Sequence, residues 1–224
     1  MTLRSALSTI HRDPHWWRKV LIGGALMATF VGYPWVAGLE IESLENTRKG
    51  FATPLPGWSD WANRYVIGLL ALLIDIMFFV LPVFGFGLLF LCGGGILAIS
   101  GVGWATWLVP AGLAALLLYQ LAMFAIGVAP VGRLIYAEAG RIEDALSARP
   151  LREALRPAAR AVYWRARLQS LPAYLPALLL FAASWLVGWP LALLLIWLGL
   201  SALCYAHLVV VQLYVAAERE AHWM

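Results

Sequence analysis

A histidine inside a long uncharged stretch is the first side chain that could do chemistry. Residues 168–217 contain no Asp, Glu, Lys or Arg, and they include His207. Ionisable side chains are costly inside a membrane and are often functional there. A neutral imidazole could ligate the metal of a haem or chlorin, with Trp185, Trp197 and Tyr205 as the walls of its pocket. The competing interpretation is a histidine that bonds to a neighbouring helix.

Asp75 is the one charged residue between positions 65 and 132. If this stretch lies in a membrane, a carboxylate within it could bind a proton or a cation, as in many transporters. We expect no buried Lys or Arg to pair with it, so the alternative is a protonated carboxyl bonded to a nearby polar group. The sequence leaves open whether Asp75 and His207 meet.

Three arginines point to a third kind of chemistry, the binding of anionic headgroups. Arg152, Arg156 and Arg160 follow one another at four-residue spacing, which predicts a basic stripe on one helix face. Such a stripe can bind anionic lipid, with each charge adding about 1 kcal/mol. A cytoplasmic protein partner is the alternative.

Other chemistry is not indicated by the sequence. It contains no GxxxxGK[ST], HExxH or GxSxG motif. Cys92 and Cys204 lie far apart without a CxxC spacing, so we expect neither a disulfide nor a metal site. The net charge of +4 does not argue for nucleic acid. We therefore expect a non-enzymatic protein, and a membrane enzyme acting on lipid is the weakest hypothesis because no nucleophile–base pair is visible.

The elements that must position these residues are apolar helices. Hydrophobic residues make up 62% of the chain and charged residues 12%, against about 25% charged residues in soluble domains. A membrane-spanning helix needs about 20 apolar residues, and only helices and closed barrels satisfy their backbone in lipid. The sequence predicts an all-α integral membrane protein. Each of the two long apolar stretches, 65–132 and 168–217, should hold two spans.

The positions of the basic residues decide the topology. If Val20–Leu39 crossed the membrane once, the arginine-rich segment after residue 132 would lie outside, although basic residues favour the cytoplasm. Gly32, Tyr33 and Pro34 form a turn signal. We therefore expect two short helices, 16–31 and 35–48, that form a re-entrant hairpin. The alternative is five plain crossings that break the charge rule.

The hairpin topology divides a single membrane domain, 1–224, into five parts. Four transmembrane helices are expected at about 65–91, 104–130, 170–188 and 190–217, with all 16 Lys and Arg residues on the cytoplasmic side. Gly93, Gly94 and Gly95 should end the first span, and Pro82 should kink it. The parts are the hairpin 16–48, an interfacial segment 49–64, spans one and two in 65–130, a cytoplasmic loop 131–169 with amphipathic helices that begin near Pro150 and Pro157, and spans three and four in 170–217.

Three separated motifs resemble a known family. RDPHWWRKVLIGG, LPGWSDWANRYVIGLL and RLIYAEAG occur in this order, and the chain resembles a prokaryotic membrane family of uncharacterised function, domain of unknown function 4013. The matching residues are Asp13, Pro14, Trp16, Leu55, Pro56, Trp58, Trp61, Tyr136, Ala137, Glu138 and Gly140. The resemblance implies the membrane architecture and no activity.

The functional hypothesis follows from these residues and this topology. We expect a multi-pass protein of the prokaryotic cytoplasmic membrane, with both termini cytoplasmic, that organises hydrophobic partners. Its apolar cofactor could be a tetrapyrrole such as a chlorophyll-type pigment, a carotenoid or a quinone, with His207 as axial ligand. Its partners would be the lipid bilayer and other membrane subunits or a second copy, which Gly85 and Gly87 could contact. The alternative is a small permease or transporter component that uses Asp75.

Overall fold

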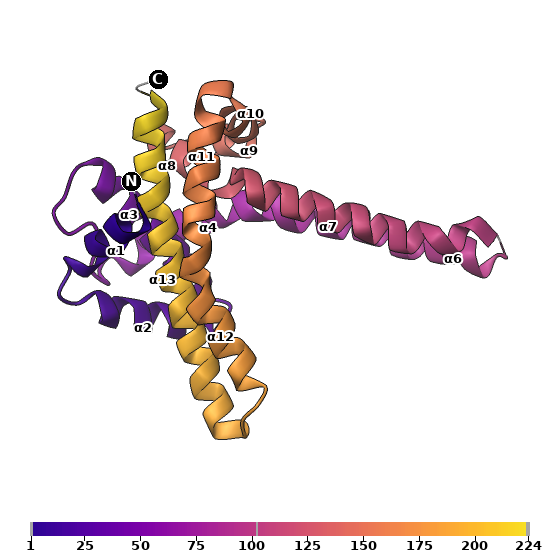
Figure 1. Cartoon of the computed structure of the whole chain (residues 1–224), viewed down its shortest axis with the longest axis horizontal. Coiled ribbons are helices and arrows are strands. Elements are labelled where there is room, and N and C mark those ends of the chain that lie inside the picture. Colours follow the sequence, from indigo (N-terminus) through magenta and orange to yellow (C-terminus); the bar gives the residue numbers. More distant parts are fainter. Residues whose placement is uncertain (1, 102, 223–224) are drawn as a thin grey trace.

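The protein consists of a helical hub and two apolar arms that leave it in different directions (Figure 1). The structure, a computed structural model, describes residues 2–101 and 103–222, and every regular element in that part of the chain is a helix. We define the first arm as residues 76–126 and the second arm as residues 175–200. The remaining helices make up the hub.

The hub gathers helices from all parts of the chain around the second half of the long helix α13. Its largest buried side chains include Leu208 and Leu213 of α13 and Leu39 and Ile41 of α3. The hub helices are α1 (Leu3–His11), α2 (Trp16–Met27), α3 (Tyr33–Arg48), α4 (Trp61–Asp75), α8 (Val128–Ala139), α9 (Ile142–Leu146), α10 (Arg149–Leu155), α11 (Pro157–Ser170), η4 (Leu171–Tyr174) and the end of α13 (Trp189–His222).

The first arm is a helical hairpin. The half that leaves the hub is interrupted by two π-helical turns. It contains η1 (Ile76–Val80), α5 (Leu81–Leu88), η2 (Leu89–Gly93), α6 (Gly94–Ile99), η3 (Gly103–Trp107) and α7 (Leu108–Ile126). Because its outgoing half continues directly from α4, one helical stretch of 39 residues runs from the hub to the end of α6.

A proline explains the first π-helical turn. Pro82 has no N–H to donate to the carbonyl of Phe78, four residues earlier. The opposite helix supplies donors: the Tyr119 hydroxyl donates to the Phe78 carbonyl over 3.2 Å, and Gln120 Nε2 donates to the Phe79 carbonyl over 2.8 Å. The kink expected at Pro82 stays a prediction; the structure shows a π-helical turn before it, and neighbouring side chains satisfy the freed carbonyls as membrane helices require.

Two glycines let α3 and α4 cross backbone to backbone in the hub. A Cβ atom on Gly68 would lie 1.7 Å from the Pro34 carbonyl oxygen, and one on Gly38 would lie 2.2 Å from the Arg64 carbonyl oxygen. Small residues at such crossings are typical of membrane helix packing. The close crossing fixes where α4 ends and the first arm begins.

The second arm is continuous with the hub. Helix α11 passes through η4 (Leu171–Tyr174) into α12 (Leu175–Ser184), and α13 returns antiparallel to them (Figure 1). The 34 residues of α13 run from the tip of the arm through the hub. Near its far end, Arg48 Nε donates to Glu218 over 2.8 Å, which ties α13 to α3.

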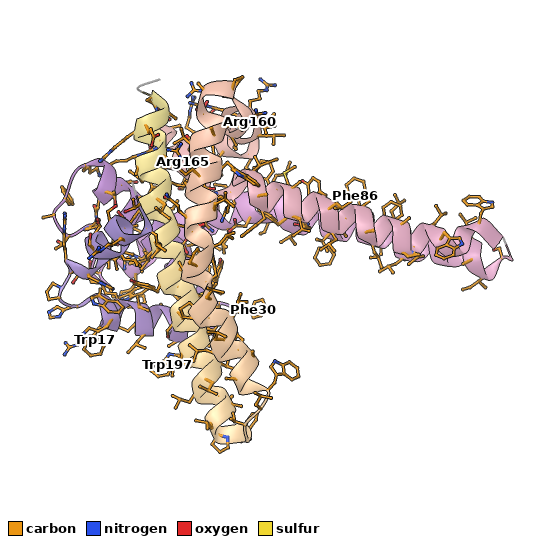
Figure 2. All side chains as sticks on the ribbon, in the orientation of Figure 1. Trp17, Phe30, Phe86, Arg160, Arg165 and Trp197 are labelled. Carbon is orange, nitrogen blue, oxygen red and sulfur yellow. The ribbon has the colours of Figure 1, made fainter. Side chains whose placement is uncertain are left out.

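Three helical stretches are long and apolar enough to cross a membrane, and they indicate a multi-pass membrane protein. They are Trp61–Ile99, Leu108–Ile126 and Trp189–His222. Neither arm contains Asp, Glu, Lys or Arg, whereas Arg160 and Arg165 lie in the hub away from both arms (Figure 2). The expected span 170–188 corresponds to η4 and the 10 residues of α12, so a count of four spans remains a prediction.

Several local expectations can be compared with the structure directly. Two helices separated by residues 28–32 replace a single crossing at Val20–Leu39, as expected, and Pro150 and Pro157 lie in the first turns of α10 and α11. The prediction that Gly93–Gly95 end the first span is wrong, because the helical path continues to Ile99. Glycine lowers helix propensity by only about 1 kcal/mol per residue, and the demand for internal backbone bonds in an apolar segment outweighs it.

Candidate functional site

Asp75 has a basic partner that the sequence analysis did not provide for. It is the last residue of α4, and its Oδ2 accepts a hydrogen bond from Arg133 Nη2 over 2.6 Å. Arg133 lies on α8, just past the first arm, and its other terminal nitrogen binds Glu40 of α3. The expectation that no Lys or Arg pairs with Asp75 is therefore wrong: Arg133 bridges two carboxylates from two helices.

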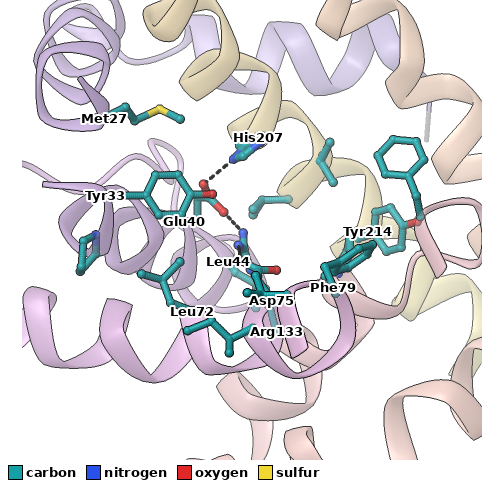
Figure 3. Close-up of a pocket in the computed structure, with 18 of the residues that line it drawn as sticks. Met27, Tyr33, Glu40, Leu44, Leu72, Asp75, Phe79, Arg133, His207 and Tyr214 are labelled. Carbon is teal, nitrogen blue, oxygen red and sulfur yellow. Dashed lines mark hydrogen bonds and ion pairs between the residues drawn. The ribbon is translucent and has the colours of Figure 1, made fainter. Parts of the chain in front are cut away.

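Glu40 extends this cluster to the histidine. Only 1% of Glu40 is exposed, and its Oε1 lies 2.9 Å from His207 Nδ1, while Oε2 takes the bond from Arg133 (Figure 3). A carboxylate can only accept, so Nδ1 of a neutral His207 carries the proton and donates it. The result is a continuous path, Asp75–Arg133–Glu40–His207, which we call the charge chain. It answers the open question of whether Asp75 and His207 meet: they belong to one cluster without direct contact.

The charge chain lines a cavity of about 640 Å³ between the roots of the two arms. This volume lies in the range of about 300–1,000 Å³ that small-molecule sites occupy. Most of the wall is apolar, and it comes from the ends of α2 and α7, from α3, α4 and η1, and from α13. The apolar wall residues include Met27, Phe30, Leu44, Leu72, Ile76, Phe79, Val80, Phe124, Val210 and Val211.

Phe30 is a strained residue on this wall. It lies in the turn between α2 and α3 with φ 57°, and 92% of it is exposed. A left-handed backbone at a bulky residue costs about 1–3 kcal/mol and tends to persist where the surroundings or function require it. Here it places an aromatic ring at the edge of the cavity instead of in the hub core.

The polar side of the cavity also carries a second arginine and three phenols. The Arg167 guanidinium carbon lies 4.2 Å from the centre of the Phe124 ring and 5.5 Å from that of Tyr214. Tyr174 lines the same side, and its ring meets His207 edge to face with centres 6.0 Å apart. Burial raises the pKa of the Tyr33 phenol above its ordinary value, although the charge of Arg133 opposes this, so Tyr33 stays a neutral hydroxyl.

The three aromatic residues proposed as walls around His207 do not line this cavity. Trp185 is 88% exposed near the tip of the second arm, the Trp197 indole donates to the Leu21 carbonyl over 3.2 Å, and the Tyr205 hydroxyl lies 2.9 Å from His11 Nε2. Helix geometry explains this result. Residues two apart on a helix are about 200° apart around its axis, so Tyr205 and His207 point to nearly opposite sides.

The basic stripe is interrupted. Helix α10 ends at Leu155 and α11 begins at Pro157, so Arg156 lies in the break with an extended ψ of 129°. Its guanidinium contacts Glu153 over 3.1 Å and the Ala221 carbonyl over 3.3 Å. Arg152, Arg156 and Arg160 are all exposed but do not share one continuous helix. Their contact with lipid headgroups remains a prediction.

Sequence reasoning missed Glu40, Arg133, Arg167, Tyr174 and Tyr214. A signal for Glu40 was present, since it lies between Leu39 and Ile41, unlike the other charged residues of 35–48. No local pattern distinguishes Arg133, because Glu138 and Arg160 of the same segment also have apolar neighbours on both sides. For metal binding, the described residues offer no group of three or more His, Cys, Asp or Glu side chains placed to hold an ion. The site is therefore a salt-bridged polar cluster beside an apolar cavity.

Comparison with known proteins identifies the family. Residues 21–193 match the family described as Protein of unknown function (DUF4013), and because the match covers well over half of the chain, the protein belongs to this family. The resemblance inferred from the three motifs is thereby confirmed. Glu40, Asp75, Arg133 and Arg167 lie within the matched residues, and His207 follows them. No curated protein and no solved structure matches the chain.

Proposed function

We propose that this DUF4013 protein is a non-enzymatic integral membrane protein that receives an apolar partner molecule in the cavity between its arms. The observation that carries the proposal is the position of the cavity, which lies where the two apolar arms join the charged hub. The walls of the cavity are mostly apolar. A molecule dissolved in the bilayer would reach such a site without crossing water.

The cofactor form of the proposal rests on the two nitrogens of His207. Nδ1 is oriented by Glu40, and Nε2 makes no hydrogen bond to the described residues. Histidine ligands of metals usually donate their other ring N–H to a carboxylate or carbonyl, which fixes the ring and raises its basicity. His207 is thus suited to be the axial ligand of a tetrapyrrole or chlorophyll-type pigment. A carotenoid or quinone would use the apolar walls alone.

The topological part of the proposal follows from charge. Both arms and their tips lack charged residues, and all 16 Lys and Arg residues lie outside the arms. Together with the positive-inside rule, this supports a topology in which the hub and both termini lie on the cytoplasmic side of a prokaryotic cytoplasmic membrane and α2 and α3 form the re-entrant hairpin. The exposed apolar arms would contact lipid, other membrane subunits or a second copy.

An absorption spectrum tests the cofactor form. The full chain is purified in mild detergent, its spectrum is recorded and its lipophilic content is extracted and identified by mass spectrometry. We expect a bound chromophore whose absorption band shifts or disappears in His207→Ala. His222→Ala is the matched control, since His222 is an exposed residue of the same helix. A colourless wild-type protein with no extractable lipophilic molecule would overturn the proposal.

One observation favours the alternative of a permease or transporter component. The charge chain joins two carboxylates and a histidine at a cavity beside helices that are long and apolar enough to cross a membrane, and such clusters carry protons in many transporters. Flux in proteoliposomes tests it. Proton-coupled uptake that is lost in Asp75→Asn would support transport, whereas unchanged uptake, or none in the wild type, would exclude this role for Asp75.

A further inference from the structure

Arg167 is the charged residue of the cavity that lacks a counter-charge. Only 4% of it is exposed, its Nε has no hydrogen-bond partner, and it forms no ion pair with any residue that the structure describes. Its guanidinium rests on the rings of Phe124 and Tyr214 instead. Burying an unpaired charge costs on the order of several kcal/mol. The surroundings of Arg167 are therefore suited to an anion that comes from outside the protein.

The acids of the cavity cannot serve this purpose because they are already paired. Arg133 binds both Glu40 and Asp75, and Glu40 also binds His207. With His207 neutral, the charge chain carries one net negative charge, but its carboxylates pair with Arg133 and His207 and none of them forms an ion pair with Arg167. A ligand head with one negative charge can pair with Arg167, whereas a second negative charge would face the carboxylates.

The Tyr214 phenol lies beside Arg167. Apart from its contact with Arg167, the Tyr214 hydroxyl has no hydrogen-bond partner among the described residues, although only 1% of Tyr214 is exposed, and it lines the same cavity. A phenol can donate to an anion, and the planar guanidinium of arginine matches the geometry of carboxylate and phosphate oxygens. The Arg167 guanidinium also lies beside Tyr214 and interacts with it, but this neutral phenol supplies no negative charge. The unpaired charge of Arg167 and the Tyr214 hydroxyl therefore indicate a place for an anion on this side of the cavity.

We propose that the cavity binds an amphipathic monoanion, whose carboxylate or phosphodiester head pairs with Arg167 and Tyr214. Its hydrocarbon part would lie along the apolar wall formed by residues such as Leu72, Phe79 and Val80. This inference rests on the proposed function, because it assigns a charge and a polarity to the occupant of the same cavity. It favours an acidic lipid, or a pigment that bears one carboxylate, over a neutral carotenoid or quinone.

Displacement of a fluorescent fatty acid tests the inference. Delipidated full-length protein in a neutral detergent is loaded with cis-parinaric acid, and oleate or oleyl alcohol is added as competitor. Hydrogen bonds to charged groups favour binding by about 10- to 100-fold, so oleate should displace the probe at correspondingly lower concentration than the alcohol. Phosphatidylglycerol against diacylglycerol repeats the comparison for a phosphodiester head.

Variants at one helix provide the matched controls. In Arg167→Gln the preference for oleate should disappear while oleyl alcohol still binds, and Arg167→Lys should retain part of it. Arg165→Gln should behave as wild type, because Arg165 is exposed and pairs with Glu220 over 3.4 Å on the hub surface. Equal binding of oleate and alcohol to the wild type would overturn the inference and leave the proposed function standing. Failure of every ligand to bind would overturn both.

A labelling experiment covers the case in which the Arg167 variants do not fold. Wild-type protein is irradiated with a fatty acid that carries a diazirine next to its carboxylate, and the modified residues are mapped by mass spectrometry. We expect labels on residues around Arg167, such as Phe124, Tyr174 and Tyr214. Labels confined to the outer surfaces of the arms would show that the head does not enter the cavity and would contradict the proposal.

Discussion

The two arms have similar compositions but join the hub in different ways. The second arm continues into the hub through α13, and 44% of the most apolar part of that helix is buried, against 6% for α7 of the first arm. The first arm joins the hub through η1 on one side and through Gly127, with φ 78°, on the other. One arm is thus the end of the central helix, and the other is attached at two irregular joints.

The charge chain lies where this difference matters. Asp75 marks the root of the first arm, His207 lies on the helix that forms the second arm, and Arg133 and Glu40 connect them. A membrane protein retains buried charges at a cost, and such residues mark functional sites more often than stabilising ones. We infer from this comparison that the charge chain fixes the orientation of the first arm relative to the second arm.

The largest expected effect is a change in the angle between the arms. Both arms need hydrocarbon around them, and the hydrocarbon core of a bilayer is a slab about 30 Å thick. Spin labels at Ile99 and Leu186, in a Cys92→Ser background, should therefore be closer together in nanodiscs than in detergent. A control pair on the second arm, Leu179 and Leu194, should keep its distance. Identical distributions in both media for the first pair would show that the joints do not move.

Loss of Arg133 should have the largest effect on stability. Arg133→Gln leaves Glu40 and Asp75 without their shared partner, and removing one member of a buried ion pair costs about 3–5 kcal/mol. Thermal unfolding in detergent measures the effect. Arg141→Gln is the control, because Arg141 makes an exposed ion pair with Asp144 over 3.3 Å. Similar stability losses in the two variants would show that the charge chain does not stabilise the fold more than an exposed ion pair does.

Glycine substitutions should separate the hub from the first arm. Gly68→Ala places a Cβ 1.7 Å from the Pro34 carbonyl oxygen, and overpacking of this kind costs about 1–3 kcal/mol. Gly85→Ala on the first arm meets nothing within 4 Å and should leave stability unchanged or raise it, because alanine is the better helix former. Chemical denaturation of both variants checks this, and equal losses would contradict the close crossing of α3 and α4.

The smallest effect concerns the π-helical turn of the first arm. Tyr119→Phe removes the donor to the Phe78 carbonyl, which should cost about 0.6 kcal/mol, as is typical of bonds between membrane helices. Pro82→Ala restores an N–H to this position, so Tyr119→Phe should have no effect in that background. A double-mutant cycle from unfolding curves measures the coupling, and additive effects would contradict the assigned role of Tyr119.

The sequence was sufficient for features that depend on local composition. Long apolar stretches predicted helices that can cross a membrane, and the Gly32-Tyr33-Pro34 turn predicted two helices where one seemed possible. Asp75 and His207 stood out because ionisable groups are rare in such stretches. These inferences need only the energetics of single segments in an apolar solvent.

The remaining features depend on how segments pack. Glu40 comes from α3, Arg133 from α8 and Arg167 from α11, and their convergence follows from tertiary contacts that no local pattern encodes. The proposed aromatic walls failed for a simpler reason, since closeness in sequence was taken for closeness in space. The period of the helix would have separated Tyr205 from His207 without any structure.

Filling the cavity tests the central claim most directly. Val80 is part of the cavity wall, and Val83, on the same arm and similarly exposed, is not. The lipophilic molecules that copurify with the wild type, Val80→Trp and Val83→Trp are extracted and quantified per mole of protein. We expect a stoichiometric molecule in the wild type and in Val83→Trp that is lost or strongly reduced in Val80→Trp. Equal content in all three proteins would show that the space between the arms is not a binding site.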